Sequence, residues 1–343
     1  MFRSKAPLRI GLAGGGTDVS PYADLYGGAI LNATISLYAY ASIELINEPK
    51  IILEALDRQE RQVFPLAPSL PIDGTLDLAK GVYNSLAARY HPAVQGFRLS
   101  TFVEAPAGSG LGTSSTLVVA ILGAFAEWYR LPLGEYDAAH YAFEIERREL
   151  GMAGGRQDQY AATFGGVNFM EFYANDKVIV NPLRIRPEYL HELGHNLLLY
   201  YTSTSRLSAR IIETQSQNVR RRDEQSIEAM HQLKEQARMM KEALLKGKVD
   251  EIGDILDFGF QQKKKMAQGI SNPLMEEIYQ TAREAGASGG KISGAGGGGF
   301  MTFYCPGNSR YGVMKALERF EGYFRPYQFV EHGLVSWTPT GKF

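Results

Sequence analysis

The feature that most constrains the fold is a glycine-rich segment between a predicted strand and a predicted helix. This segment, Pro106–Ser115, follows a strand expected at Phe97–Val103. The residues from Ser114 to Tyr129 are apolar on nearly every side, which predicts a buried helix. Glycines let the backbone approach a ligand closely, and a helix N-terminus offers unpaired N–H groups. Together they predict a site for phosphate groups.

Two common nucleotide-binding motifs do not fit this segment. A P-loop would end in Gly-Lys-Ser or Gly-Lys-Thr, which is missing here. The Gly-x-Gly-x-Gly run that begins at Gly108 has the wrong last spacing for a dinucleotide fingerprint, and the acidic residue expected about 20 positions later is absent. The hydroxyls of Thr113, Ser114 and Ser115 can cap the helix or bind a metal. Taken alone, the segment is more often a flexible turn with an ordinary cap.

Strand and helix patterns together predict an α+β fold. The chain has 343 residues, more than a single core usually holds, so we expect two domains, 1–185 and 186–343, with a boundary near 181–187. Strands are expected at 8–12, 29–46, 51–56, 97–103, 165–172, 178–180, 197–201 and 300–305. Helices are expected at 76–90, 114–129, 133–150, 208–247, 249–266, 273–285 and 310–320. Asn272 is the predicted N-cap of the helix at 273–285, with Pro273 at its first position.

Composition excludes several classes of protein. Acidic and basic residues balance to a net charge of −1, which argues against a nucleic-acid partner. Cys305 is the only cysteine, so an intrachain disulfide and a cysteine zinc site are excluded. The N-terminus lacks a signal-peptide pattern, and no run approaches the ~20 apolar residues of a membrane span. We therefore expect a cytoplasmic protein without a membrane partner, either a monomer or a homodimer.

Two more glycine-rich segments, Arg9–Asp18 and Lys291–Phe300, lie towards the two ends of the chain. With Pro106–Ser115 they resemble, in order and separation, the three motifs of the galactokinase, homoserine kinase, mevalonate kinase and phosphomevalonate kinase (GHMP) superfamily. The resemblance spans nearly the whole chain. It implies an N-terminal ribosomal-protein-S5-like α/β domain, a C-terminal ferredoxin-like α+β domain, and ATP-dependent phosphorylation of a small molecule.

The resemblance also implies which residues hold ATP and Mg²⁺. Mg²⁺ prefers oxygen ligands and keeps several waters, so the Ser114 hydroxyl and the Glu146 carboxylate suffice as its protein ligands. Without the resemblance, Glu146 would belong to a solvated helix face. The expected ATP contacts are Pro106, Gly108, Gly110, Leu111, Gly112, Thr113, Ser114, Ser115, Gly294, Gly296 and Gly297.

The catalytic pair is implied in the same way. The segment Glu146–Gln159 is similar to the galactokinase segment that ends in Asp-Gln, which makes Asp158 the catalytic carboxylate. Asp158 would accept or orient the proton of the acceptor hydroxyl, and Arg9 would stabilise the transferring phosphoryl group. Taken alone, Asp158 is more often a helix cap, and Arg9 a surface arginine.

The Gly14-Gly15-Gly16 run points to a subgroup. Most superfamily members carry Gly-Glu-His at this position. Together with the segments Gly289-Gly290-Lys291 and 269–272, the glycine run looks most like the corresponding segments of D-glycero-D-manno-heptose 7-phosphate kinases. L-fucose kinase domains are similar. The implied reaction phosphorylates the anomeric hydroxyl and gives a heptose 1,7-bisphosphate for nucleotide-activated heptose synthesis.

The implied sugar contacts are Asp18, Gly15 and Gly16. For the acceptor's own phosphate, Arg156 is our hypothesis because it lies two residues from Asp158. Arg206 and Arg210 are further candidates. For each arginine, an ordinary surface position is at least as well supported.

Four other functions compete with a small-molecule kinase: a zinc protease, a protein kinase, a decarboxylase and a non-catalytic sugar sensor. The run His191–His195 matches the His-Glu-x-x-His signature of zinc proteases, but a helix there can start only near Pro187, and a strand is expected from Leu197, which leaves about two turns. Asp257-Phe258-Gly259 lacks the companion motifs of protein kinases. The run 263–265, three lysines, is expected to be a solvated helix face. A decarboxylase or a non-catalytic sugar sensor would keep the fold without kinase activity.

Overall fold

The larger sheet forms the body of the first half of the chain. A computed structural model describes residues 1–91, 95–204 and 208–341. Eight strands form this sheet in the order β12-β1-β2-β5-β3-β4, while β6 pairs with both β2 and β7. The strands are β1 (Phe2–Ala13), β2 (Gly28–Leu45), β3 (Lys50–Ala55), β4 (Glu60–Pro65), β5 (Phe97–Val103), β6 (Val167–Phe172), β7 (Val178–Pro182) and β12 (Val335–Trp337).

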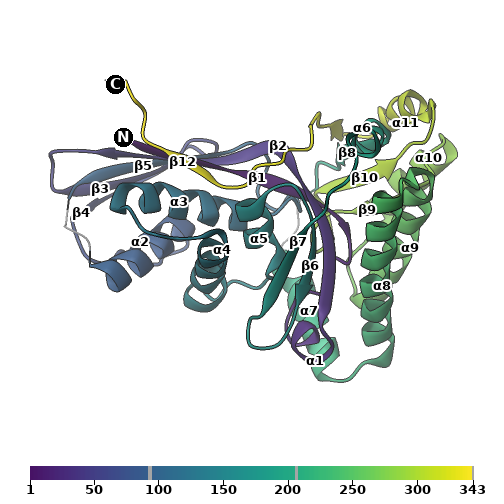
Figure 1. The fold of residues 1–343 in the computed structure, drawn as a ribbon, viewed down its shortest axis with the longest axis horizontal. Coiled ribbons are helices and arrows are strands. Elements are labelled where there is room, and N and C mark those ends of the chain that lie inside the picture. Colours follow the sequence, from purple (N-terminus) through teal and green to yellow (C-terminus); the bar gives the residue numbers. More distant parts are fainter. Residues whose placement is uncertain (92–94, 205–207, 342–343) are drawn as a thin grey trace.

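Helices of the first half cover one face of this sheet (Figure 1). Their centre is α3, whose residues Val118 and Phe125 are fully buried against Phe97 and Leu99 of β5. An apolar helix fits this position because it is covered by the sheet on one side and by neighbouring helices on the other. The helices are α1 (Tyr22–Tyr26), α2 (Asp77–Tyr90), α3 (Thr113–Tyr129), α4 (Glu135–Phe143), the π-helix η1 (Glu144–Glu149) and α5 (Gln157–Phe164).

The second half has a smaller antiparallel sheet in the order β11-β8-β10-β9. Its strands are β8 (Leu197–Tyr201), β9 (Gly289–Ile292), β10 (Phe300–Tyr304) and β11 (Tyr323–Phe324). Helices pack around it at the other end of the molecule (Figure 1). They are α6 (Pro187–Asn196), α7 (Ser208–Arg220), α8 (Glu224–Lys246), the 3₁₀ turn η2 (Val249–Glu251), α9 (Ile252–Met266), α10 (Pro273–Glu284) and α11 (Ser309–Leu317).

A shared hydrophobic core joins the two halves. Ile10 and Leu12 of β1 belong to the same buried cluster as Leu199 of β8, Met240 of α8 and Leu256 of α9. The chain also returns to the first sheet at its end, because β12 pairs antiparallel with β1. The far end of β1 therefore lies where the two halves meet. The division at residue 185 stays a prediction.

Most expected elements are confirmed, and two expected helices differ. The run 208–247 is two helices, because the Asp223 side chain accepts the Ser226 N–H at 2.7 Å and starts α8 anew. The run 133–150 is α4 followed by the π-helix η1. The predicted cap of α10 is confirmed, with Asn272 accepting from Met275 N–H at 3.1 Å.

Candidate active site

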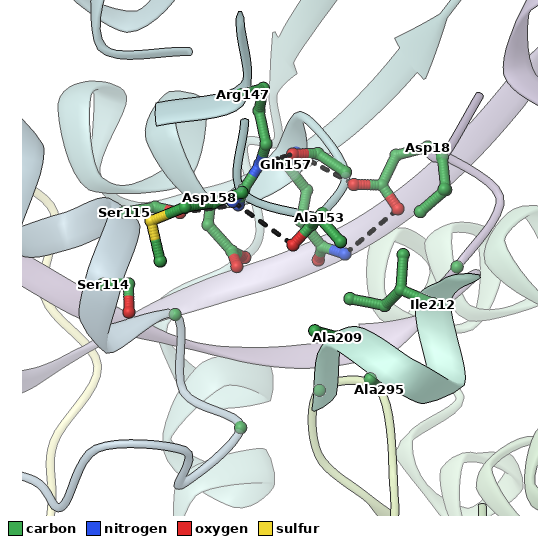
Figure 2. A pocket seen from close by; sticks show the side chains of 18 of the residues that line it. Asp18, Ser114, Ser115, Arg147, Ala153, Gln157, Asp158, Ala209, Ile212 and Ala295 are labelled. Atoms are coloured by element: carbon green, nitrogen blue, oxygen red, sulfur yellow. Dashed lines mark hydrogen bonds between the residues drawn. The ribbon is translucent and has the colours of Figure 1, made fainter. Parts of the chain in front are cut away.

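A cleft of about 660 Å³ lies where the halves meet, with Asp18, Ser114, Asp158 and Ala295 on its walls (Figure 2). The first half contributes the loop after β5, the start of α3, η1 and the start of α5. The second half contributes α7, α9 and the loop before β10. Seven of the expected ATP-binding residues line the cleft: Gly108, Gly110, Gly112, Thr113, Ser114, Ser115 and Gly294.

The loop from β5 to α3 has the backbone of an anion site. Gly108, Gly110 and Gly112 all have positive φ, between 72° and 83°, a region that side chains disfavour. Gly112 precedes α3, so the unpaired N–H groups of the first turn belong to the cleft residues Thr113 and Ser114. A Cβ on Gly112 would lie 3.1 Å from Cγ of Asp158. The loop can therefore pass close beside that carboxylate.

The two glycine loops that the sequence keeps far apart touch each other. The Phe300 N–H donates to Ser109 O at 2.9 Å. A Cβ on Gly110 would lie 2.6 Å from Ser293 O, and a Cβ on Gly294 would lie 2.6 Å from Cα of Gly110. The loops thus meet backbone to backbone and form one wall of the cleft.

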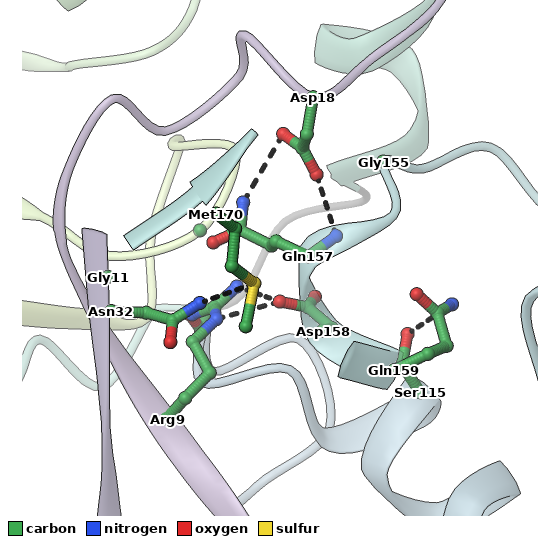
Figure 3. Close-up of polar contacts among 12 residues, drawn as sticks. Arg9, Gly11, Asp18, Asn32, Ser115, Gly155, Gln157, Asp158, Gln159 and Met170 are labelled. Carbon is green, nitrogen blue, oxygen red and sulfur yellow. Dashed lines mark hydrogen bonds and ion pairs between the residues drawn. The ribbon is translucent and has the colours of Figure 1, made fainter. Parts of the chain in front are cut away.

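Arg9 and Asp158, which both line the cleft, form an ion pair (Figure 3). Nε and a terminal nitrogen of Arg9 lie 2.7 and 2.6 Å from Asp158 Oδ1. The other terminal nitrogen donates to Gly110 O. Within the described part of the chain, Asp158 Oδ2 has no hydrogen-bond donor, and the Asp158 side chain remains one-fifth exposed. The carboxylate is therefore fixed through one oxygen and accessible through the other.

Asp18 is the second carboxylate, and it is buried. Its oxygens accept from the backbone N–H and the side-chain amide of Gln157, at 3.0 and 3.3 Å (Figure 3). Burial raises the pKa of Asp18, and the nearby Asp158 charge adds to this, although the Gln157 N–H opposes it. A Cβ on Gly155 would lie 1.9 Å from Asp18 Oδ2, so only glycine leaves room for this carboxylate.

Ser114 and Glu146 fit a Mg²⁺ ion. Glu146 lies in η1 and is 1% exposed; Oε2 accepts from Gln159 Nε2 at 2.6 Å, and Oε1 pairs with Arg147 at 3.1 Å. The Ser114 hydroxyl lines the cleft and has no hydrogen bond to another described residue. Both are hard oxygen donors, and each Glu146 oxygen keeps lone-pair capacity. In the described ranges, no cluster of three or more His, Cys, Asp or Glu could hold a metal, so protein ligands here would be few.

Comparisons with known proteins place the chain in a family. The model of the GHMP kinases N-terminal domain matches residues 77–166, and that of the GHMP kinases C-terminal domain matches 240–318. A D-glycero-alpha-D-manno-heptose 7-phosphate kinase of Campylobacter jejuni is 46% identical over 336 residues, which is 98% of each chain. The chain is a GHMP kinase.

Two further relatives agree. A solved D-glycero-D-manno-heptose 1-phosphate kinase from Bacteroides thetaiotaomicron has a TM-score of 0.86 and 45% identity, covering 99% of this chain and 100% of the other. An L-fucokinase/L-fucose-1-P guanylyltransferase of Bacteroides fragilis is 27% identical over 323 residues, which is 87% of this chain and 34% of that protein. The expected family, two-domain fold and class of enzyme, a phosphotransferase with an alcohol acceptor, are confirmed. Kinases of this family use ATP.

Several predicted site residues of this GHMP kinase do not line the cleft. Leu111 is fully buried in the core, and Pro106 is exposed at the start of its loop. Gly296 and Gly297 pack on Ile270, where the Gly297 N–H donates to Ile270 O at 2.8 Å. These residues shape the two loops; their contact with ATP stays a prediction.

Arg156 lies beside the cleft in an adjoining cavity of about 1040 Å³. Its guanidinium is 2.9 Å from Asp24 Oδ1 and donates to Tyr173 O at 2.9 Å. Arg210 and Arg220 are both exposed on α7, but of the two only Arg220 lines this cavity. Arg206 lies outside the described residues.

The expectation that 263–265 form a solvated face is wrong for Lys263. Lys263 is 2% exposed, lines the cleft and donates to Gly294 O. Burial lowers its pKa to about 8, with the Arg9 charge as the second cause. The helical periodicity of the sequence could have predicted this burial, because Ile252, Leu256, Phe260 and Lys263 fall on one buried face of α9. The run of three lysines made that periodicity hard to recognise.

Lys291 is a second buried lysine that the sequence analysis did not assign. It is 5% exposed, and its Nζ donates to Gly11 O at 2.6 Å. Burial lowers its pKa well below the usual value, and the charges of Lys263 and Arg9 add to this. Lys291 does not line the cleft, and its hydrogen bond to Gly11 connects β9 to β1.

The His-Glu-x-x-His run lies on α6, and none of its residues lines the cleft or the adjoining cavity. The helix ends at Asn196 and β8 begins at Leu197, as expected. His191 and His195 are both exposed.

None of the helices in the described ranges is long and apolar enough to cross a bilayer.

Proposed function

We propose that this GHMP kinase phosphorylates the anomeric hydroxyl of D-glycero-D-manno-heptose 7-phosphate, with ATP and Mg²⁺, to form the 1,7-bisphosphate for nucleotide-activated heptose synthesis. The observation that carries a sugar acceptor is the pairing of two carboxylates through adjacent residues: Gln157 holds Asp18, and Asp158 follows it in the first turn of α5. The similarity to the Campylobacter jejuni heptose 7-phosphate kinase supports the heptose.

The donor side of the mechanism rests on the phosphate loop. The N–H groups at the start of α3 bind the phosphates of ATP, aided by the positive end of the helix dipole. Mg²⁺ bound by Ser114 and Glu146 would neutralise phosphate charge. Arg147, which pairs with Glu146 and donates to Ser115 Oγ at 3.1 Å, positions both elements. The loop and η1 are thus held in register before the donor binds.

The acceptor side rests on Asp158 and Asp18. Arg9 holds Oδ1 of Asp158, so Oδ2 is presented to the anomeric hydroxyl and orients it or takes its proton. Asp18 accepts hydrogen bonds from other sugar hydroxyls, with Gly15 and Gly16 leaving room for the ring. Arg9 also stabilises the charge of the phosphoryl group in transfer.

The far end of the sugar extends into the adjoining cavity, which shares Asp18, Arg147 and Gly154 with the cleft. Arg156 and Arg220 line it. Arg156 is already held by Asp24, whereas no described carboxylate lies within ion-pair distance of Arg220. Arg220 is therefore the better placed of the two to bind the 7-phosphate, with Arg156 as the alternative.

The test is ATP-to-ADP turnover with heptose 7-phosphate, heptose 1-phosphate, mannose 6-phosphate, L-fucose, galactose and mevalonate, followed by phosphorus NMR of the product. We expect turnover with heptose 7-phosphate and a new phosphate on C1. Turnover of heptose 1-phosphate alone would place the new phosphate elsewhere and refute the anomeric assignment.

An L-fucose 1-kinase is the second candidate, favoured by the similarity to the bifunctional Bacteroides fragilis protein. Turnover restricted to L-fucose in the same panel would select it. A non-catalytic sensor or a decarboxylase is disfavoured because Arg9, Ser114, Glu146 and Asp158 all line one cleft. Release of ADP without a phosphorylated sugar would revive the decarboxylase, and no release of ADP with any acceptor would revive the sensor.

A further inference from the structure

We propose that Lys263 is a further catalytic residue, whose ammonium group contacts the γ-phosphoryl group of ATP as it passes to the acceptor. The proposal rests on the proposed phosphoryl transfer from ATP in this cleft, and not on which sugar accepts it. It assigns a role to a side chain from the second half of the chain.

The first observation is a buried cation without a matching anion. Lys263 is 2% exposed, and its hydrogen-bond partner in the described structure is a neutral carbonyl, Gly294 O. In the described ranges no carboxylate lies within ion-pair distance of its Nζ. Burying an ammonium group is costly unless it is paired. An anionic ligand that enters the cleft would supply the missing partner.

The second observation is the crowding of positive charge. Arg9 lies near enough that its charge, after burial itself, lowers the pKa of Lys263, and Lys291 is lowered in turn by both. The Asp18 charge acts in the opposite direction on Lys263. Arg9 is neutralised by Asp158. Among the described cleft residues Arg147 pairs with Glu146, which leaves Lys263 as the cation without a carboxylate partner, and its charge matches a group as anionic as a phosphoryl.

The third observation is position. Gly294, which Lys263 holds, lies against Gly110 of the phosphate loop, and Arg9 donates to Gly110 O. Lys263 from α9 and Arg9 from β1 therefore both lie at the contact between the two glycine loops. On the other side, a Cβ on Gly15 would lie 3.5 Å from Lys263 Nζ. The ammonium group thus lies between the donor loop and the glycine run that precedes Asp18, where the phosphoryl group must cross.

The neighbouring lysines show that this placement is particular to Lys263. Lys264 pairs with Glu276 at 3.1 Å, and Lys265 is exposed and donates to Gln262 Oε1 at 3.2 Å. Neither lines the cleft. Lys265 therefore provides a matched control on the same helix.

The experiment compares Lys263→Met, Lys263→Arg and Lys265→Met in the full chain. Calorimetry gives the Kd of ATP and of ADP, each with Mg²⁺; steady-state assays give kcat and KM with the best acceptor; thermal melting gives Tm. For Lys263→Met we expect ATP to bind at least tenfold more weakly, ADP within twofold of wild type, kcat about 100-fold lower and Tm not lower. Lys263→Arg should recover part of kcat, and Lys265→Met should match wild type throughout.

Three outcomes would overturn the proposal. If Lys263→Met changes the acceptor KM and leaves ATP affinity intact, Lys263 binds the acceptor. If ATP and ADP affinities fall together with Tm, the lysine is structural. If Lys263→Met keeps wild-type kcat and wild-type affinity for ATP, it does not contact the phosphoryl group. Failure of every sugar in the panel would refute the proposed acceptor, yet the comparison of ATP with ADP would still decide this proposal.

Discussion

The two walls of the cleft differ in the groups that they offer to a negatively charged ligand. On the donor wall, the segment 108–115 offers backbone N–H groups and hydroxyls and carries no ionisable side chain. On the facing wall, charge comes from side chains: Arg9 on β1, Asp158 on α5 and Lys263 on α9, with Asp18 nearby. Helix dipoles can be buried without an unpaired charge, whereas each buried side-chain charge needs a partner that folding must bring to it. The donor wall is therefore local in sequence, and the facing wall is not.

The largest effect should come from removing the Asp158 carboxylate from the facing wall. Replacing Asp158 by Asn keeps its size but loses the carboxylate that Arg9 holds. We expect kcat to fall about 1000-fold, which corresponds to about 4 kcal/mol. Coupled ADP release measures it, with the exposed Asp57→Asn as control. A loss smaller than tenfold would mean that positioning by the walls is enough without Asp158.

The cost of buried charge on the facing wall should appear as a pH effect on stability. The folded pKa of Lys263, about 8, lies below its ordinary 10.5. Below pH 8 both folded and unfolded chains carry the proton, so wild type bears the full cost. Between these two pKa values only the unfolded chain keeps the lysine proton. As the pH increases through this range, the unfolding free energy of wild type should therefore rise relative to that of Lys263→Met, by on the order of 3 kcal/mol.

Urea unfolding of both proteins at several pH values from 7 to 10 measures this difference. Arg9 and Asp18 face the same region in both proteins, whereas the pKa of Lys291 is lowered in part by the Lys263 charge, so the difference reports Lys263 together with its effect on Lys291. A difference that stays flat across this range would show that Lys263 is not desolvated.

On the donor wall, a substitution that displaces the backbone should weaken the use of ATP. In Gly110→Ala, the added Cβ would meet Ser293 O at 2.6 Å, at a φ of 83°. We expect kcat/KM for ATP to fall about thirtyfold, about 2 kcal/mol, because the two loops must separate. Gly74→Ala is the control, since Gly74 also has positive φ, at 92°, but has open space around it. Equal losses in both variants would attribute the effect to backbone strain alone.

The smallest effect should be confined to the acceptor. In Gly155→Ala, the added Cβ would meet Asp18 Oδ2 at 1.9 Å and displace it. We expect KM for the sugar to rise about tenfold while the Kd of ATP stays unchanged. Gly312→Ala, on α11 with its nearest contact at 3.4 Å, controls for the substitution. If ATP binding weakens as well, the two walls do not act independently.

Local signals predicted much of this structure. The apolar run of α3, the Asn272 cap of α10 and the strands at 97–103 and 300–305 depend on neighbouring residues, so the sequence alone predicts them. The break between α7 and α8 was missed because a polar helical pattern continues through it, and only the Asp223 cap reveals the new start. The resemblance supplied the predicted roles of Arg9, Glu146 and Asp158, which no local pattern distinguishes from ordinary surface charges.

The sequence by itself determined the family and the class of reaction, because three glycine-rich motifs keep their order and separation along the chain. It also predicted the phosphate loop, because a glycine run, a helix start and an apolar helix are all written in one continuous segment. Only the tertiary structure decided which charges are buried. Lys263 and Lys265 are two residues apart in a run of three lysines, yet one lines the cleft and the other is exposed. The physical reason is that burial depends on what packs against each face of α9, and that packing comes from the neighbouring helix α8, from β9 and from β1 at the other end of the chain.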